Sequence, residues 1–283
     1  MVLLAVDDGT VRSRDLESGA PRGRARPGGD IRELACVEVD SRPVAVSGCG
    51  DGQVRLWDVG ARRPLYDALT GHKGPVSAVA AAIVDGHPVA VTGSSLDNAA
   101  RAWDLQRGRP FGPPLVGHSG GVRSVATTVV DGYAFAVTAG GADRSFRVWD
   151  LTDGPSLHRT VYTGLIGAVA CVTVDGQPAA VTVGGYDDVL RLWNLTSGRQ
   201  LEDCRMGHSG RVLSLASATL GGRSTVVTGC TDGTLCIWDL KTGQATTHAM
   251  PGTVNHIAIA SDGALVVSAG HEIVVLESGE GRL

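Results

Sequence analysis

A tryptophan followed by Asp or Asn recurs five times along this 283-residue chain at almost constant spacing. The five pairs are Trp57-Asp58, Trp103-Asp104, Trp149-Asp150, Trp193-Asn194 and Trp238-Asp239. Successive pairs are 46, 46, 44 and 45 residues apart, and an Asp stands six residues before every Trp. A repeat of this length with fixed internal offsets predicts an array built from one supersecondary unit.

The best preserved unit, Gly117–Leu151, shows what is repeated. It opens on Gly-His and continues with an apolar run over Val122–Val130, a turn at Asp131-Gly132 and a second run over Ala134–Thr138. A third run closes on the Trp-Asp pair. The runs are short and β-branched, and Asp-Gly suits a two-residue hairpin turn with positive φ, so every unit is predicted to be a small antiparallel sheet. Because the first run is almost continuously apolar, we expect its strand to be buried on both faces.

This pattern resembles the WD-repeat β-propeller family, of a bacterial type, and the resemblance covers almost the entire chain. It implies an all-β fold in a single domain over residues 1–283, with radial sheets as blades. The units fall at approximately 1–27, 28–70, 71–116, 117–163, 164–206, 207–249 and 250–283. Seven blades with three-stranded terminal blades use every predicted strand. The six-blade alternative makes Pro21–Arg26 the outer strand of the last unit and leaves Val2–Asp15 unplaced.

Three units contain a His, a Thr, an Asp and a Trp at equivalent positions. These sets are His72, Thr92, Asp97 and Trp103; His118, Thr138, Asp143 and Trp149; and His208, Thr228, Asp232 and Trp238. The resemblance implies a buried hydrogen-bonded chain in each unit, with a structural role. The string Gly117-His118-Ser119-Gly120-Gly121 also matches the G-x-S-x-G motif of hydrolases, but that motif requires a strand-turn-helix context, whereas strands are predicted on both sides here. We therefore expect no catalytic residue.

Composition narrows the classes of partner. The net charge of −4 and the pI near 6.0 argue against nucleic acid and anionic membranes. No apolar run is long enough for a signal peptide or a membrane helix, which favours the cytoplasm. The six cysteines lack paired metal-ligand spacing and are interpreted as small strand residues, so neither a metal nor a cofactor is expected. The scarcity of Lys, only Lys73 and Lys241, points to a GC-rich bacterial genome.

The function expected from the resemblance is that of a non-enzymatic scaffold, a monomer that presents its top face to a protein or peptide partner. In this family the top face includes the residues that flank the first apolar residue of each inner strand and the residue before the turn Asp. In the fourth blade-forming unit these flanking positions are taken as Ala168 and Ala170 around Val169. The larger side chains on the predicted face are Arg32, Leu96, Arg123, Tyr186, Arg211 and Leu213.

Arg and Tyr are enriched at interface hot spots, so these side chains predict a partner with an acidic or carboxyl-bearing segment. A chain that starts inside a unit also favours the C-terminal regulatory part of a larger signalling protein. The alternative is a propeller enzyme with a site at the mouth of the channel.

Overall fold

Hairpin turns and runs of β-branched residues fold the described part of the chain into β-strands connected by turns and loops. The computed structural model describes residues 2–6, 10–14, 18, 20–25, 28–184, 189–205, 208–220, 222–259, 263–270 and 272–276. In this described part the strands form seven antiparallel sheets in chain order, without a helix and therefore without a helix that could cross a membrane. The residues divide into two compact units, Met1–Thr163 and Gly164–Leu283, and the boundary coincides with a boundary between two repeats.

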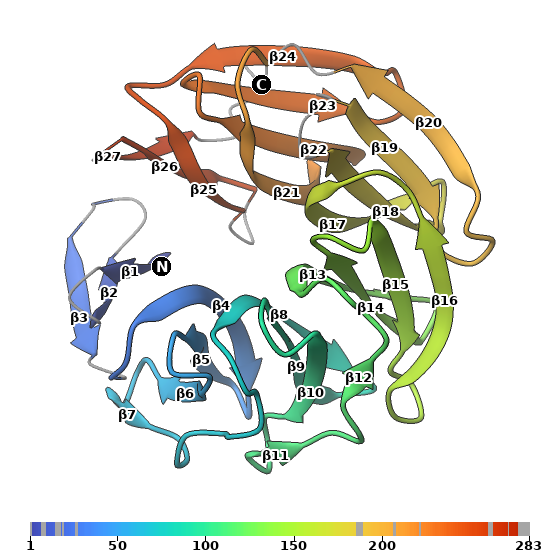
Figure 1. The fold of residues 1–283 in the computed structure, drawn as a ribbon. Helices are drawn as coiled ribbons and strands as arrows, with labels where there is room; N and C mark the ends of the chain where they lie inside the picture. The colour runs from blue at the N-terminus through green and yellow to red at the C-terminus, as the bar shows by residue number, and fades with distance from the viewer. Residues whose placement is uncertain are drawn as a thin grey trace. The chain divides into compact units, whose positions relative to one another are not determined.

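The first unit contains four sheets (Figure 1). Its strands are β1 (Val2–Val6), β2 (Thr10–Arg14), β3 (Pro21–Ala25), β4 (Ile31–Val39), β5 (Arg42–Cys49), β6 (Val54–Asp58), β7 (Arg63–Pro64), β8 (Val76–Val84), β9 (His87–Ser94), β10 (Ala99–Asp104), β11 (Arg109–Pro110), β12 (Leu115–Val116), β13 (Val122–Val130), β14 (Tyr133–Gly140), β15 (Ser145–Asp150) and β16 (Ser156–Tyr162). The sheets are β1–β3, β4–β7, β8–β12 and β13–β16. In the third of them the outer strand is split, because β11 and β12 both pair with β10.

The second unit contains three sheets, β17–β20, β21–β24 and β25–β27. Its strands are β17 (Ile166–Val174), β18 (Gln177–Gly184), β19 (Val189–Asn194), β20 (Gln200–Arg205), β21 (Val212–Leu220), β22 (Arg223–Cys230), β23 (Thr234–Asp239), β24 (Gln244–Ala249), β25 (Val254–Ile259), β26 (Leu265–Ala269) and β27 (Glu272–Leu276). The first and last sheets of the chain each have three strands. Of the segment Pro21–Arg26, which the six-blade alternative assigns to the last unit, Pro21–Ala25 pairs instead with β2.

The hairpins have the predicted turn geometry. Both residues of the turns Asp85-Gly86, Asp131-Gly132 and Asp175-Gly176 have positive φ, between 47° and 80°. This left-handed pair gives a turn whose twist matches that of the flanking strands, and Gly adopts it without strain. The turn Asp40-Ser41 has the same geometry without a glycine, with φ of 49° and 60°, and the sequence pattern did not identify it. Of the fourth predicted Asp-Gly turn, Asp262 lies outside the described residues.

The burial of the strands corrects one prediction. The first strand of each sheet is not the one buried on both faces: several residues of β13 remain partly or fully exposed, whereas β14 is buried from Ala134 to Gly140. The same contrast separates β8 from β9. The physical reason is the order of strands, because the first strand forms an edge of its sheet and the second lies between two strands.

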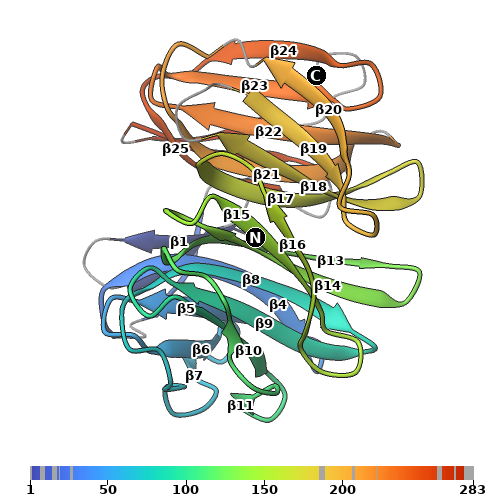
Figure 2. The ribbon, with the colours of Figure 1, turned by 45° about the vertical axis from the view of Figure 1, so that its right-hand side comes forward.

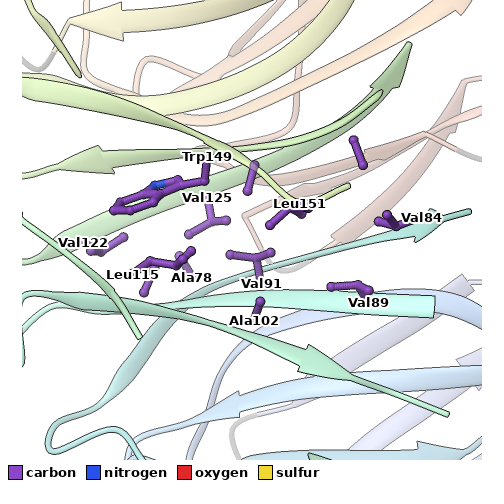
Figure 3. Close-up of a cluster of buried hydrophobic side chains, with 13 residues drawn as sticks. Ala78, Val84, Val89, Val91, Ala102, Leu115, Val122, Val125, Trp149 and Leu151 are labelled. Atoms are coloured by element: carbon purple, nitrogen blue, oxygen red, sulfur yellow. The ribbon is translucent and has the colours of Figure 1, made fainter. Parts of the chain in front are cut away.

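Core clusters lie between consecutive sheets of the same unit, namely β4–β7 and β8–β12, β8–β12 and β13–β16, β17–β20 and β21–β24, and β21–β24 and β25–β27. In Met1–Thr163 the inner strands β4 and β8 are in contact, as are β8 and β13, and Figure 2 shows these sheets as successive layers. Figure 3 shows the cluster between β8–β12 and β13–β16, in which Trp149, Val122 and Val125 face Leu115 and Val91. Burial of each such valine or leucine contributes about 1.5–3 kcal/mol, so packing between sheets holds each unit together.

Candidate functional site

The most complete polar chain lies in the sheet β13–β16. His118 Nδ1 is 2.7 Å from Asp143 Oδ2, and His118 Nε2 is 2.8 Å from Thr138 Oγ1. The indole Nε1–H of Trp149 donates to the same hydroxyl at 2.9 Å. The backbone N–H groups of Ser119 and Ser145 donate to the Asp143 carboxylate at 3.2 Å each. The four predicted side chains therefore join the third strand, the second strand and the loop that enters the first.

The sheet β8–β12 repeats this geometry closely. His72 lies 2.8 Å from both Asp97 Oδ2 and Thr92 Oγ1, and the Trp103 indole donates to Thr92 at 2.8 Å. Backbone N–H groups of Lys73 and Ala99 donate to Asp97 at 3.0 Å. In both sheets the His side chain has no exposed surface, and the Asp carboxylates are 6% and 7% exposed.

The hydrogen bonds that link these four side chains run in one direction, from the Trp indole to the Asp carboxylate. The indole N–H donates to the Thr oxygen, so the Thr hydroxyl donates to His Nε2, and His Nδ1–H donates to the carboxylate. Burial lowers the pKa of His72 and of His118, although the neighbouring carboxylate opposes the shift. Each imidazole is therefore neutral at pH 7, with both nitrogens engaged.

The two Asp carboxylates have lowered pKa values. Burial alone raises the pKa of Asp97, but hydrogen bonds from the Lys73 N–H and from His72 more than offset this and lower it. For Asp143 burial also raises the pKa, and the hydrogen bond from His118 is the largest of the contributions that lower it.

These shifts predict a loss of stability in mild acid. An unfolded imidazole takes up a proton near pH 6.5, whereas His72 and His118 resist it until lower pH, so the unfolded state binds more protons as the pH falls below about 6.5. The Asp contributions are present above about pH 3.9 and are lost as the pH falls from there through the lower folded values. We expect the free energy of unfolding, from urea titrations, to decrease between pH 7.5 and pH 5.

Variants separate this effect from general acid sensitivity. His118→Gln should flatten the dependence on pH between 7.5 and 5, whereas His87→Gln, which changes an exposed side chain, should leave the slope unchanged. Equal slopes in the two variants would contradict the assignment to the buried imidazoles.

The third predicted set, in the sheet β21–β24, is arranged differently. His208 Nε2 lies 2.8 Å from Thr228 Oγ1, and the Trp238 indole donates to Thr228 at 3.3 Å. However, His208 Nδ1 is 3.9 Å from the Asp232 carboxylate, and the hydroxyl of Thr234 lies between them, 2.6 Å from each. Asp232 also accepts from the Ser209 N–H at 2.7 Å. The sheet β21–β24 therefore lacks the direct His–Asp hydrogen bond that β8–β12 and β13–β16 have.

Sheets without the His use the remaining residues differently. In β17–β20 the Trp193 indole donates to Thr182 at 2.8 Å, and the Gly-His pair that precedes β8, β13 and β21 is missing from the sequence. The turn Asp of this sheet, Asp187, lies outside the described residues. In β4–β7 the Trp57 indole N–H is buried without a hydrogen-bond partner, although Ser47 occupies the Thr position.

The turn Asp of the sheet β4–β7 has a different partner. Arg55 donates twice to Asp51, at 3.2 and 2.6 Å. This hydrogen bonding from Arg55 is the largest cause that lowers the pKa of Asp51. This partly exposed carboxylate thus pairs with an arginine of the third strand of its own sheet.

The hydrolase-like string around Ser119 has the surroundings of a strand, not of a nucleophile elbow. It connects β12 to β13, and its serine N–H donates to Asp143. His118, the base that such a serine would require, is bound on both nitrogens by Asp143 and Thr138. Among the described residues, this segment holds a loop in place and presents no general base to its serine.

In six of the sheets the first strand, called the inner strand here, carries a β-bulge directly after its first residue. The shifted registers fall between Ile31 and Glu33, Val76 and Ala78, Val122 and Ser124, Ile166 and Ala168, Val212 and Ser214, and Val254 and His256. The unpaired residues are therefore Arg32, Ser77, Arg123, Gly167, Leu213 and Asn255. A bulge redirects a side chain out of the regular pleat, so this position is suited to present a residue at the end of the sheet.

The bulges correct the predicted register of one sheet. Ala168 and Ala170 do not flank the first residue of the inner strand, because the strand begins at Ile166 and its bulge lies at Gly167. The residues from Ile166 to Val172 are all apolar, so no polar residue marks the start of the strand, which is why the pattern pointed to Val169 instead. Leu165 and Gly167 occupy the equivalent positions.

In the unit Met1–Thr163 the inner strands begin at one common edge, called the top face here. The Ser77 hydroxyl donates to the Val122 carbonyl at 3.2 Å, which joins the starts of β8 and β13. The Gly121 N–H donates to Asn98 Oδ1, in the loop between β9 and β10, at 2.7 Å. These contacts place the predicted residues Leu96 and Arg123 on the same edge of this unit. Arg32 occupies the corresponding bulge of β4.

The individual top-face residues differ in their surroundings. Leu96 is 72% exposed, and Arg123 has no ion-pair partner in the part of the chain that the structure describes. Arg32 contacts Asp30 at 2.5 Å, so its charge is already compensated. In the unit Gly164–Leu283, Arg211 is exposed and its N–H donates to Thr231, and Leu213 is 38% exposed. Tyr186, the remaining predicted residue, lies outside the described residues.

The sequence pattern did not predict one cluster of possible metal ligands. His208, Cys230 and Asp232 each offer an atom within 4.8 Å of the other two. Cys230 Sγ is also 3.5 Å from the Asp232 N–H, and Cys236 Sγ is 3.9 Å from His208 Nδ1. The cysteines are six residues apart and the histidine is far upstream, so no compact ligand motif shows in the sequence. Burial raises the pKa of both thiols.

Comparison with known proteins identifies the fold. Among solved structures, one described as "Structure of U3-55K" aligns with a TM-score of 0.77 at 23% identity, over 95% of this chain and 85% of that one. A second, "Crystal structure of RRP9 WD40 repeats", aligns with the same score and identity over 95% and 84%. At this identity the likeness shows the fold alone. No curated protein matches the sequence.

The predicted all-β propeller of WD repeats is confirmed by these structures and by the repeats themselves. The family described as "WD domain, G-beta repeat" matches residues 31–58, 63–104, 112–150 and 200–239, which together make up more than half of the chain. The chain belongs to the WD domain, G-beta repeat family.

Proposed function

We propose that this protein is a non-enzymatic scaffold that binds an acidic segment of a partner protein on the top face of the unit Met1–Thr163. The observation that carries the proposal is the position of Leu96. This large apolar side chain is 72% exposed at the edge where the inner strands begin. A single exposed leucine is common on protein surfaces, so its neighbours decide what it can bind.

Two cationic residues stand on either side of Leu96. A Cβ at Gly74 would lie 2.6 Å from Leu96 Cβ, so the loop that carries Lys73 is next to it. On the other side, the carbonyl of Ser95 approaches Gly121, two residues before Arg123. Lys73 and Arg123 are exposed. An apolar side chain between two cations fits a peptide in which Asp or Glu residues flank an apolar residue.

The backbone around these residues supports their use as a binding surface. Leu96 and Asp97 both donate from their backbone N–H groups to Ser94 Oγ at 3.4 Å, and the buried polar chain of Asp97 fixes the same loop. Arg123 is held at a bulge of β13. Loops fixed by a stiff sheet lose little conformational freedom on binding, which is the usual basis of recognition on such scaffolds.

The enzyme alternative receives less support from the described residues. The Asp, His and Thr side chains that resemble a catalytic set are repeated in three sheets. They bind one another directly in β8–β12 and β13–β16, and the Thr234 hydroxyl bridges His208 and Asp232 in β21–β24. Thr138 has no exposed surface and accepts from an indole, so its hydroxyl cannot reach a substrate without breaking the core.

Peptide selection tests the proposal whatever the natural partner is. Random peptides displayed on phage are selected against the immobilised full chain, and binding of the selected peptides is measured by fluorescence anisotropy. We expect acidic peptides with a central apolar residue, whose affinity falls as the salt concentration rises. The variant Lys73→Gln/Arg123→Gln should weaken binding by about tenfold or more.

The matched control removes a cation at the opposite edge. Arg109→Gln changes an exposed residue that pairs with Asp104 at the far end of β10. It should leave peptide affinity unchanged, and circular dichroism should show that both variants are folded. Selection of peptides without acidic residues, or equal loss of binding in the control, would contradict the proposal. Leu96→Ser should weaken the binding of the same peptides. Arg211→Gln tests whether the unit Gly164–Leu283 contributes to their affinity.

A further inference from the structure

The sheet β21–β24 departs from other sheets of the chain at one position of its third strand. Two residues before the Trp, four consecutive sheets carry an arginine. These residues are Arg55, Arg101, Arg147 and Arg191. All four are paired in register with the Ser or Thr that belongs to the polar chain. In the sheet β21–β24 the residue paired with Thr228 is Cys236.

The arginine has a defined place beside the His–Asp pair. Arg147 donates from Nη2 to the Gly117 carbonyl at 2.7 Å and from Nη1 to Thr160 at 2.9 Å, so its guanidinium lies under the loop that carries His118. Arg101 lies against Gly71 in the same way. Arg147 and Arg101 thus each place a positive charge close to a buried imidazole and the carboxylate bound to it. In β21–β24 the carboxylate of Asp232 is retained, but the arginine is replaced by a thiol.

The space beside His208 is instead surrounded by metal-ligand atoms. A ring nitrogen of His208, Cys230 Sγ and an Asp232 carboxylate oxygen lie within 4.8 Å of one another. Cys236 Sγ is 3.9 Å from His208 Nδ1 and shares a hydrogen bond with the Thr247 hydroxyl at 3.3 Å. His208, Cys230 and Cys236 are buried, and the Asp232 side chain is 13% exposed. The His–Asp separation of 3.9 Å compares with 2.8 and 2.7 Å in β8–β12 and β13–β16, the two sheets that have both a His–Asp pair and the arginine.

This geometry is close to that of a four-coordinate metal site. With Zn–S bonds of about 2.3 Å and Zn–N or Zn–O bonds of about 2.0–2.2 Å, tetrahedral ligand atoms are roughly 3.4–3.8 Å apart. The donors of His208, Cys230 and Asp232, now within 4.8 Å of one another, would each have to approach the others by roughly 1.4 Å at most. Cys236 Sγ, which is 3.9 Å from His208 Nδ1, would have to leave its 3.3 Å hydrogen bond with the Thr247 hydroxyl. The Thr234 hydroxyl, which lies between His208 and Asp232, would rotate away. Two sulfur donors with one imidazole and one carboxylate favour zinc over magnesium or calcium, which prefer oxygen ligands.

We propose that His208, Cys230, Asp232 and Cys236 form a structural zinc site, in which the metal ion supplies the positive charge that an arginine supplies in the sheets β8–β12 and β13–β16. The two thiols bind as thiolates and release their protons when the metal enters. The ion would join the second strand, the third strand and the loop before β21, as the His–Asp bond does in the sheets β8–β12 and β13–β16. This inference is independent of the top-face partner.

The structure offers a matched pair of variants. Cys236→Arg restores the residue of the other sheets and removes one ligand, so it should abolish tight zinc binding while preserving the fold. Cys49→Ala changes another buried cysteine, the one at the position of Cys230 in the sheet β4–β7, where Arg55 remains. That variant should bind zinc like the parent.

Three measurements decide the outcome. After dialysis against zinc and then buffer, the full chain should retain one zinc per chain by elemental analysis, and zinc should raise the melting temperature of the parent and of Cys49→Ala. Cobalt substitution should give the thiolate charge-transfer absorption and the intense visible bands of a tetrahedral site. In Cys236→Arg, zinc affinity should fall by more than about tenfold.

The proposal is overturned by sub-stoichiometric zinc in the parent, by a cobalt spectrum without thiolate bands, or by equal zinc affinity in Cys236→Arg. The cobalt spectrum of the parent needs no variant, so it decides the question even if Cys236→Arg does not fold. Zinc binding that is lost equally in Cys49→Ala would place the metal elsewhere and also refute this site.

Discussion

Replacement of Thr138 by Val should lower the free energy of unfolding by about 2–4 kcal/mol, because it leaves two buried polar groups without a partner at almost constant volume. The Thr138 hydroxyl is fully buried, accepts from the Trp149 indole at 2.9 Å and lies 2.8 Å from His118 Nε2. Valine retains the shape of threonine, so no cavity adds to the effect. The measurement is urea unfolding followed by circular dichroism at pH 7.5.

The sheet β4–β7 provides the control for this prediction. Ser47 stands at the position of Thr138, but the Trp57 indole is already without a partner, and the Ser47 hydroxyl bonds to the Arg55 carbonyl at 3.3 Å. Ser47→Ala should therefore cost about 1 kcal/mol or less. Similar losses from Ser47→Ala and Thr138→Val would show that strand packing, and not the polar chain, determines the effect.

Much of the fold could be predicted because it is encoded locally. The strand Val122–Val130 was predicted with the bounds of β13, since an Asp-Gly turn marks its end and a Gly-His loop its beginning. Which strand is buried on both faces could not be predicted from the local sequence in the same way. Apolar character marks both β13 and β14, and only the position of a strand inside its sheet determines which one loses both faces to solvent.

The details of the polar chains depend on side-chain positions that a repeat pattern does not contain. The third tetrad has all four residues of the other two, yet its His–Asp bond is replaced by two hydrogen bonds through Thr234. The equivalent residue after Asp143 is Ser145, whose buried hydroxyl has no hydrogen-bond partner. Whether such a hydroxyl enters the His–Asp pair depends on its neighbours, and Cys236 in place of an arginine changes those neighbours.

The sequence pattern also did not predict how neighbouring sheets pack on one another. The middle strands of three sheets contain a glycine that receives a valine from the following sheet: Gly48 faces Val76, Gly93 faces Val122 and Gly229 faces Val254. A Cβ at these glycines would lie 2.6, 2.4 and 2.3 Å from a valine Cγ1. These glycines have no positive φ, so it is contact with the next sheet, and not backbone conformation, that excludes a larger residue.

Replacement of Gly93 by Ala should therefore destabilise the unit Met1–Thr163 by about 1–3 kcal/mol, although alanine is normally the better residue in a regular strand. The added methyl group would meet Val122 Cγ1 at 2.4 Å and Val125 Cγ2 at 3.1 Å. Both neighbours are β-branched, and Val122 is fully buried in the core cluster between the two sheets, so neither can rotate away easily. Urea unfolding measures the loss. Gly164→Ala is the control, because nothing lies within 4 Å of its Cβ position.

A double-mutant cycle shows whether Val122 causes the loss. Val122→Ala removes the methyl group that the new side chain meets, so Gly93→Ala should cost less in that background than in the parent chain, with a coupling energy of about 0.5–3 kcal/mol. Additive losses would mean that the two residues act separately, and a loss from Gly164→Ala as large as that from Gly93→Ala would point to the backbone instead. A positive coupling would establish that a valine inserted over a glycine fixes how one sheet of this unit lies on the next.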